Sequence, residues 1–137
     1  AGTRPAGYGL EVSAGEYVEW VNRETLVCVQ LEEAEALRNV GEIVRVEGVD
    51  VFFIGPSDLS QSLGYPGQTS HPVVQAAIDA ALAAIVGAGK APGTAGSAEA
   101  IASALGKGCL YAYTHVPKLL STASDAFFDV VRGAGAG

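Results

Sequence analysis

The sequence alternates four times between a short apolar segment typical of a β-strand and a segment with helical spacing. The strand-like segments cover residues 26–32, 49–54, 90–95 and 108–114. The helical segments that follow them cover residues 33–40, 70–86, 97–105 and 117–131, with apolar side chains recurring three or four residues apart. Such alternation favours parallel strands joined by right-handed helical crossovers. The sequence therefore predicts an α/β fold built from four β/α units.

The remaining segments are predicted from turn and cap signals. Residues 1–12 are Gly-rich and irregular, and Ser13 and Glu16 then form a capping box for a helix that we expect to end near Asn22. We expect a loop at residues 55–69 with one helical turn at 59–63, and Ser70 as the cap of the helix that follows. Residues 1–137 are predicted to form a single domain, with a flexible tail at 133–137.

Four β/α units are half of the eight that close a barrel of roughly 250 residues. We therefore expect a (β/α)₈ TIM-barrel type of fold, of which this chain supplies half. A four-unit sheet alone would expose two edges and one face of the barrel interior, so association is expected, either as a homo-oligomer or with a complementary half barrel.

The composition narrows the classes of function. The formal net charge is −7 with no cluster of Lys or Arg, which excludes nucleic-acid binding because phosphates require clustered cations. No apolar segment is long enough to cross a bilayer and the N-terminus lacks the pattern of a signal peptide, so we expect no membrane contact and a cytoplasmic location. Cys28 and Cys109 lie in apolar segments and are expected to be buried, reduced thiols.

Two carboxylates stand where strand-like segments end. Glu32 ends the first segment, and Asp58 follows the second within Phe-Ile-Gly-Pro-Ser-Asp. Strand alternation places Cys28, Gln30 and Glu32 on one face and the intervening apolar residues on the other, where helices would cover them. Carboxylates at the ends of neighbouring strands can share one hard divalent cation, so the pair is a candidate metal site.

Several segments resemble, in the same order and at similar spacing, the HpcH/HpaI aldolase/citrate lyase family. The resemblance is closest to its 4-hydroxy-2-oxoheptanedioate aldolase branch and covers nearly the whole chain, which would be the C-terminal half of the barrel. The segments are Gln30-x-Glu32, Glu47-Gly-Val-Asp50, Phe53-Ile-Gly-Pro-Ser-Asp-Leu-Ser60, Leu63-Gly-Tyr-Pro66, His71-Pro72 and Gly89-Lys-Ala-Pro-Gly93.

The resemblance implies a class II, pyruvate-dependent carbon–carbon lyase that cleaves 4-hydroxy-2-oxo acids to pyruvate and an aldehyde through a metal-stabilised pyruvate enolate. Glu32 and Asp58 match the residues that hold Mg²⁺ or Mn²⁺ in the family, and other divalent cations such as Co²⁺ also accept carboxylate and water ligands. Gln30 matches a position that donates a hydrogen bond to the substrate oxygen. The backbone N–H groups of Ser57 and Asp58 are expected to bind the substrate carboxylate.

Other interpretations of these residues stay open. Glu32 can instead be a favourable acid in the first turn of the next helix, and Gln30 a hydrogen-bonded polar residue of the barrel interior. His71 is expected to have a structural role in a first helical turn. His115 follows the fourth strand, where barrel chemistry takes place, and is a candidate catalytic residue, although the family usually shows Gly-x-Asp near this position.

The chain lacks matches for two further elements of the family pattern, an Arg that binds the pyruvate carboxylate and a His-containing acid/base pair. Two functions therefore remain as alternatives to an aldolase. One is a non-catalytic metal-binding or assembly half barrel. The other is a citrate-lyase-like acyl-CoA lyase, which is disfavoured because no basic cluster is available for phosphates.

Overall fold

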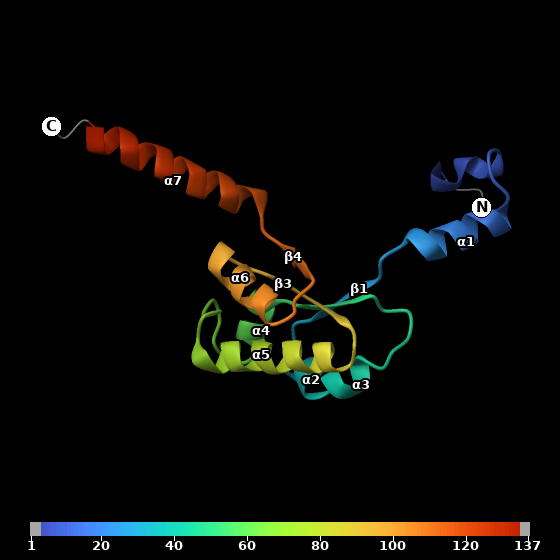
Figure 1. Ribbon diagram of the computed structural model, residues 1–137, viewed down its shortest axis with the longest axis horizontal. Helices are drawn as coiled ribbons and strands as arrows, with labels where there is room; N and C mark the ends of the chain where they lie inside the picture. The colour runs from blue at the N-terminus through green and yellow to red at the C-terminus, as the bar shows by residue number, and fades with distance from the viewer. Residues whose placement is uncertain (1–3, 135–137) are drawn as a thin grey trace.

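The computed structural model describes residues 4–134, and within that range it has four strands. These are β1 (Cys28–Leu31), β2 (Val51–Ile54), β3 (Ala91–Ala95) and β4 (Tyr111–Tyr113). The helical elements are η1 (Arg4–Gly9), α1 (Ala14–Glu24), α2 (Ala34–Arg38), α3 (Val40–Ile43), α4 (Pro56–Ser62), α5 (Pro72–Gly87), α6 (Ala98–Gly106) and α7 (Val116–Ala134). Each strand leads into one or two helices, which confirms the four β/α units (Figure 1).

The four strands form one parallel sheet in the order β1-β2-β3-β4. Leu31 lies opposite Ile54, and Ile54 lies opposite Thr94. The C-terminal ends of β1, β2 and β3 therefore reach the same edge of the sheet. In parallel α/β proteins that edge is where ligands bind.

The two faces of the sheet differ in what covers them. On the outer face, Leu31, Phe52 and Ile54 are buried in a core that includes side chains of α4 and α5. Full burial of an apolar side chain of this size contributes about 1.5 to 3 kcal/mol. The inner face carries Gln30, which is exposed. The alternation predicted for the first strand is confirmed.

The α5 helix contributes the most extended part of this core. Apolar residues that recur at helical spacing along it are buried, namely Val74, Ile78, Leu82 and Ile85. Its cap, however, is His71 and not Ser70, because Pro72 begins the helix and the residue before it takes the capping position. The Val73 N–H donates to Nδ1 of His71 over 3.3 Å.

Two segments are more helical than the sequence predicted. The loop expected at residues 55–69 begins with α4, seven residues long, where one turn at 59–63 was expected. Pro56 starts α4 and buried Leu59 anchors it to the core, so tertiary packing overrides the turn-forming composition. The single helix expected at residues 33–40 is divided into α2 and α3 at Asn39, whose backbone leaves the helical region.

Strand β3 contains a proline although it lies between two other strands. The carbonyl oxygen of Pro92 accepts from the Leu110 N–H over 3.0 Å. In a parallel pair, an N–H group at position 92 would point to the residues of the neighbouring segment that precede Leu110. Those residues are not part of β4, which begins only at Tyr111. The missing donor therefore costs the sheet no ladder bond, and Pro92 is tolerated there.

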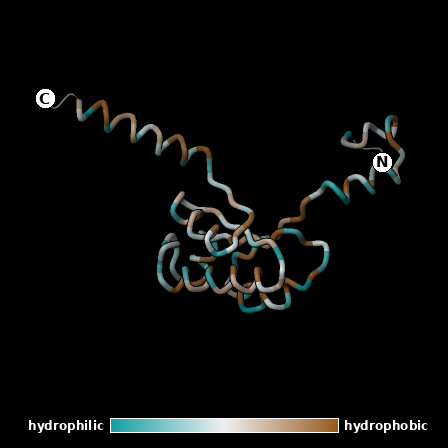
Figure 2. Tube along the Cα trace, in the orientation of Figure 1, coloured by the Kyte–Doolittle hydropathy of each residue, from teal (hydrophilic) through white to brown (hydrophobic). Residues whose placement is uncertain are grey.

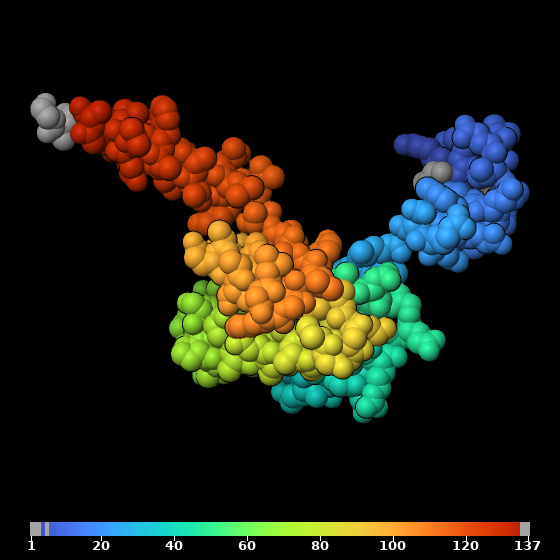
Figure 3. Space-filling view, viewed as in Figure 1, coloured from blue at the N-terminus to red at the C-terminus, as the bar shows by residue number. Residues whose placement is uncertain are grey.

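The two terminal helices extend away from the sheet (Figures 1 and 3). Neither α1 nor α7 contains a buried residue. Their aromatic residues Trp20, Phe127 and Phe128 are 51%, 64% and 47% exposed. The inner stripe expected for the last helix therefore has no partner within the described residues, and Figure 2 shows hydrophobic positions along α7.

Two further expectations need correction. A flexible tail is expected at residues 133–137, but α7 continues through Gly133 and Ala134, and residues 135–137 lie outside the described range. Cys109 is buried as expected, but Cys28 is exposed because its side chain lies on the inner face of the sheet. Both thiols are free.

No helix among the described residues is long and apolar enough to span a membrane.

Gly93 provides a test of the packing on the inner face. A Cβ atom there would lie 2.9 Å from Cδ2 of Phe53 and 3.1 Å from both Cδ1 of Tyr111 and Cγ1 of Val51. We expect Gly93→Ala to lower the free energy of unfolding, measured by urea denaturation, by about 1 to 3 kcal/mol through overpacking. The control is Gly106→Ala, since a Cβ at that helical position meets nothing within 4 Å. Equal stability of the two variants would contradict this packing.

Candidate functional site

The candidate site lies at the edge of the sheet where β1 and β2 end. Glu32 is the first residue after β1, and the turn after β2 leads through Gly55 into α4. The Gly55 N–H donates to the Leu31 carbonyl oxygen over 3.3 Å, so the pairing of the two strands continues to their ends. This pairing brings the segments that carry Glu32 and Asp58 to one corner of the sheet.

The Glu32 side chain lies directly against Gly55. A Cβ atom on Gly55 would be 3.1 Å from Oε2 of Glu32 and 3.2 Å from its Cβ. Gly55 is buried and Glu32 is partly buried. The absence of a side chain at Gly55 therefore leaves room for the Glu32 carboxylate beside the start of α4.

Asp58 and Ser57 lie in the first turn of α4 and both are exposed. The N-cap of α4 is Gly55, which offers no side-chain acceptor to the N–H groups of this turn. Fully buried Ser60 stabilises this turn, because its hydroxyl donates to the Ser57 carbonyl oxygen over 2.7 Å. The first turn of α4, which includes the N–H groups of Ser57 and Asp58, is thereby tied to a buried side chain.

A second contact holds α4 to the turn after β1. The Ala34 N–H donates to the Ser62 hydroxyl over 2.9 Å, so the last residue of α4 caps the start of α2. The start of α2 is consequently tied to the end of α4. The relative position of the two carboxylate-bearing segments depends on these backbone contacts.

The chemistry of these residues fits a hard divalent cation. Two carboxylates supply oxygen ligands, and the space at Gly55 admits one of them. No three His, Cys, Asp or Glu side chains converge anywhere in residues 4–134. A cation held by two carboxylates alone would keep several coordination positions for water and substrate.

Gln30 lies on the inner face of β1, one inward position before Glu32, and is exposed. It is opposite Phe53 of β2 in the register. Its amide is therefore free to donate toward a ligand held at the end of the strand.

Beyond Gln30, the inner face is aromatic. The Phe53 ring is stacked on Tyr113 at 5.1 Å and meets Tyr111 edge-on at 6.2 Å. Tyr113 in turn meets the His115 ring edge-on at 5.5 Å. His115 is exposed and follows β4 at the same edge of the sheet as the carboxylates. Strand periodicity alone did not reveal this cluster, because its rings come from two strands separated by β3.

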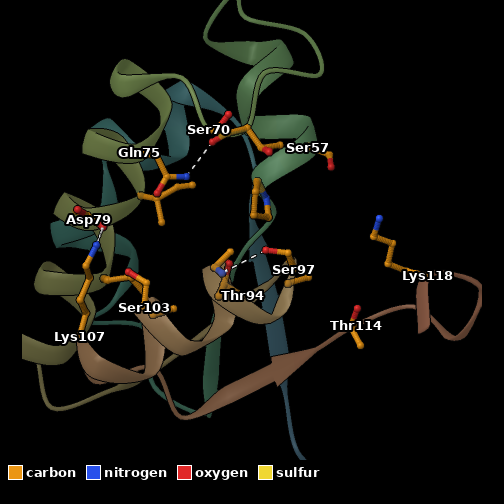
Figure 4. A pocket seen from close by; sticks show the side chains of 18 of the residues that line it. Ser57, Ser70, Gln75, Asp79, Thr94, Ser97, Ser103, Lys107, Thr114 and Lys118 are labelled. Atoms are coloured by element: carbon orange, nitrogen blue, oxygen red, sulfur yellow. Dashed lines mark hydrogen bonds and ion pairs between the residues drawn. The ribbon is translucent and has the colours of Figure 1, made fainter. Parts of the chain in front are cut away.

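A cavity of about 440 Å³ opens beside the candidate site, between α5 and α6 (Figure 4). Ser57 and His115 both line it, together with Thr114 and Lys118 of the segment after β4. Sequence analysis did not identify Thr114 or Lys118, because a single Lys and a single Thr carry no recognisable motif. Gly55 was also missed, although a glycine between a strand and a proline is a signal for close packing.

Some of the charged side chains around the cavity form ion pairs within the described residues and others do not. Lys107 forms an ion pair with Asp79, with Nζ and Oδ1 2.6 Å apart, and Figure 4 shows this pair at the side of the cavity. The pKa of Glu99 is lowered, mainly by a hydrogen bond from Ser97, then by a backbone hydrogen bond and to a lesser extent by the charge of Lys118.

Comparison with known proteins identifies the family. The profile of the family described as "HpcH/HpaI aldolase/citrate lyase" matches residues 3–111. A 4-hydroxy-2-oxo-heptane-1,7-dioate aldolase of Shigella sonnei is 51% identical over 78 residues, which are 57% of this chain and 30% of that protein. The protein of the same name from Salmonella typhimurium is 47% identical over 87 residues, 64% of this chain and 33% of its own length.

Solved structures show the same relationship. A HpcH/HpaI aldolase/citrate lyase family protein of Burkholderia cenocepacia superposes with a TM-score of 0.84 and 32% identity, over 95% of this chain and 50% of that one. A HpcH/HpaI aldolase of Desulfitobacterium hafniense superposes with a TM-score of 0.76 and 27% identity, over 95% of this chain and 52% of that one. The TIM-barrel type of fold is confirmed, and the chain spans about a third of the named aldolases and half of these structures. The chain belongs to the HpcH/HpaI aldolase/citrate lyase family.

Proposed function

We propose that the protein takes part in the divalent-metal-dependent cleavage of 4-hydroxy-2-oxo acids to pyruvate and an aldehyde. The observation that carries this proposal is the Glu32 carboxylate lying against Gly55 at the corner from which Asp58 projects. The names of the relatives support the reaction class. The cytoplasmic location expected from the sequence is part of the same proposal.

In this reaction the C3–C4 bond of the substrate breaks. The C4 hydroxyl loses its proton and becomes the aldehyde, and C3 gains a proton to become the methyl group of pyruvate. Bound Mg²⁺ or Mn²⁺ would supply Lewis-acid catalysis by drawing charge toward the 2-oxo oxygen of the substrate. Glu32 and Asp58 are the residues that would hold the ion.

The chain's own residues would orient the 2-oxo acid. The Gln30 amide donates a hydrogen bond to the 2-oxo oxygen from the inner face of β1. The N–H groups of Ser57 and Asp58 donate to the C1 carboxylate, because the first turn of α4 has no side-chain cap to occupy them. His115 is the candidate for moving a proton, since its imidazole can accept and donate one at this edge.

Exchange of the pyruvate C3 protons with solvent tests the proposal. We expect the chain with Mn²⁺ to accelerate deuterium incorporation at C3 in heavy water, followed by proton NMR. Glu32→Gln or Asp58→Asn should lower the metal-stimulated rate at least about tenfold, because each removes an ionised ligand oxygen. The matched control is Glu33→Gln, an exposed carboxylate beside Glu32.

The outcome of this experiment separates two functions. Mn²⁺ binding that depends on Glu32 and Asp58 without any exchange would favour the non-catalytic metal-binding module. Neither binding nor exchange, or exchange that both substitutions leave unchanged, would overturn the metal assignment.

Gly55 provides an independent test of the metal corner. Gly55→Ala should weaken Mn²⁺ binding about tenfold, measured by isothermal titration calorimetry, because the added Cβ displaces the Glu32 carboxylate from a contact of 3.1 Å. The control is Gly41→Ala, because the added Cβ meets nothing within 4 Å. Gly64 is unsuitable as a control because its φ of +85° would strain any residue other than glycine. Undiminished affinity in Gly55→Ala would show that Glu32 is not a ligand.

The partner included in this proposal is a second copy of the chain, docked through α7. The apolar stripe of α7 consists of exposed side chains at helical spacing, including Leu119, Leu120 and Phe127, which are 56%, 65% and 64% exposed. Uncovered apolar surface of this kind is typical of protein interfaces. Lys118 and Asp125 lie on the opposite face of the helix and would stay accessible.

Sedimentation velocity tests this association. We expect the chain to be oligomeric at micromolar concentration and Leu120→Glu to shift it toward the monomer, because a charge would enter the apolar interface. Thr122→Glu places the same charge on the polar face and should leave the distribution unchanged. A wild-type chain that is monomeric at this concentration would contradict the proposal.

A further inference from the structure

His115 stands just after β4 with a fixed backbone and an exposed side chain. The N–H groups of Lys118 and Leu119 donate to its carbonyl oxygen over 2.9 Å and 3.2 Å, so the start of α7 fixes the backbone. An exposed side chain on a fixed backbone still exchanges between rotamers. A group that moves a proton must keep its nitrogen within hydrogen-bond reach of the reacting atom, so the imidazole needs a further contact to hold it.

Tyr113 supplies such a contact. Its ring meets the His115 imidazole edge-on, with the ring centroids 5.5 Å apart and the planes at 86°. Aromatic pairs prefer this geometry, and one pair favours the rotamer that makes the contact by about twofold to tenfold over the alternatives. Tyr113 is itself 40% exposed, so its own ring needs support as well.

Phe53 provides this support from a buried position. Its ring is only 2% exposed and stacks on Tyr113, with the centroids 5.1 Å apart and the planes at 11°. The two residues lie on β2 and β4, so their rings meet over β3. Gly93 of β3 lies opposite Phe53 in the register, and the absence of a side chain there leaves room for the rings. Ring contacts thus connect a buried residue of β2 to the imidazole after β4.

The row of residues at the ligand end of the sheet is open between Tyr113 and the metal corner. Ala95 is paired with Tyr113, and continuing the register by one residue places Gly55 beside Ala95 and Glu32 beside Gly55. Strand alternation puts this row on the inner face of the sheet. Three strand spacings, about 14 Å, separate β1 from β4. Only a hydrogen atom and a methyl group stand between Glu32 and Tyr113 in this row, which leaves space for a small 2-oxo acid.

We propose that Tyr113 is a positioning residue that holds the His115 imidazole in one orientation at this edge. The ring makes both contacts, so the ring and not the hydroxyl carries the effect. When pyruvate exchanges its C3 protons in heavy water, the imidazole takes the proton, the electron pair stays with the substrate, and a deuteron returns to C3. The inference rests on the proposed function for this role of His115 in proton transfer.

The chain has two histidines, which allows the orientation of the imidazole to be observed by proton NMR. We would record the ring resonances and the Hα–Hβ couplings of His115 and His71 in the full chain, assigned with His115→Gln and His71→Gln. Tyr113→Leu should move the His115 resonances and bring its couplings to the averaged values of a freely rotating side chain. The His71 ring stacks on Tyr65 with the centroids 3.8 Å apart, so its signals should stay unchanged and serve as the internal reference.

The metal-stimulated exchange of the pyruvate C3 protons measures the consequence. Tyr113→Leu should lower the rate about fivefold, whereas Tyr113→Phe keeps the ring and should stay within about twofold of wild type. Tyr111→Leu is the matched control, because it removes a tyrosine ring from the same face of β4 whose contact is with Phe53. Its rate should also stay within about twofold of wild type.

A double variant shows whether Tyr113 acts through His115. His115→Gln should lower the rate by itself, and adding Tyr113→Leu should cause no further loss, because the imidazole that Tyr113 positions is already gone. A further loss in the double variant, or a wild-type rate in His115→Gln or Tyr113→Leu, would overturn the positioning role. An equal loss in Tyr113→Phe, or His115 couplings that Tyr113→Leu leaves unchanged, would overturn it as well.

Failure of the proposed function has a different signature. In that case wild type would show no metal-stimulated exchange, while the His115 couplings would still respond to Tyr113→Leu and support the orientation of the imidazole. No exchange together with unchanged couplings would overturn both. Normal wild-type exchange with unchanged couplings would refute this inference alone.

Discussion

The parallel pairing of β1 with β2 is the constraint on which the candidate site depends. With Leu31 opposite Ile54, both strands end at one level, and the next residues along the chain are Glu32 and Gly55. Their contact is close enough that a methyl group on Gly55 would crowd the carboxylate. A shift of the register by one residue would turn Glu32 to the helical side of the sheet, because side chains alternate between faces.

Stability and function are divided between the two faces of this sheet. The outer face is buried under α2 to α5 and supplies most of the apolar core. The inner face carries Gln30 at the ligand end and an aromatic cluster around Phe53 toward β4. Gln30 therefore extends from a strand whose opposite face is fixed by packing, which limits the movement of its side chain.

The candidate site has two chemically different parts that meet at Ser57. One part is a corner with two carboxylates, suited to a hard cation and the oxygen atoms of a 2-oxo acid. The other is the cavity with an apolar floor and Lys118 at its rim.

Several features followed from the sequence alone. Periodicity predicted the four β/α units and the buried stripe of α5, because the burial of apolar side chains on one face leaves a regular spacing in the chain. It also predicted that Glu32 and Gln30 share a face. The string around Asp58 indicated the family, since few folds need those residues in that order.

Other features were decided by the tertiary structure. The length of α4, the cap at His71 and the tolerance of Pro92 in an inner strand depend on contacts with segments distant in the sequence. The same holds for the space at Gly55 and for the cavity between α5 and α6. Local spacing can place a side chain on a face, but it cannot tell which residues of another strand or helix will stand opposite, because that depends on register and packing.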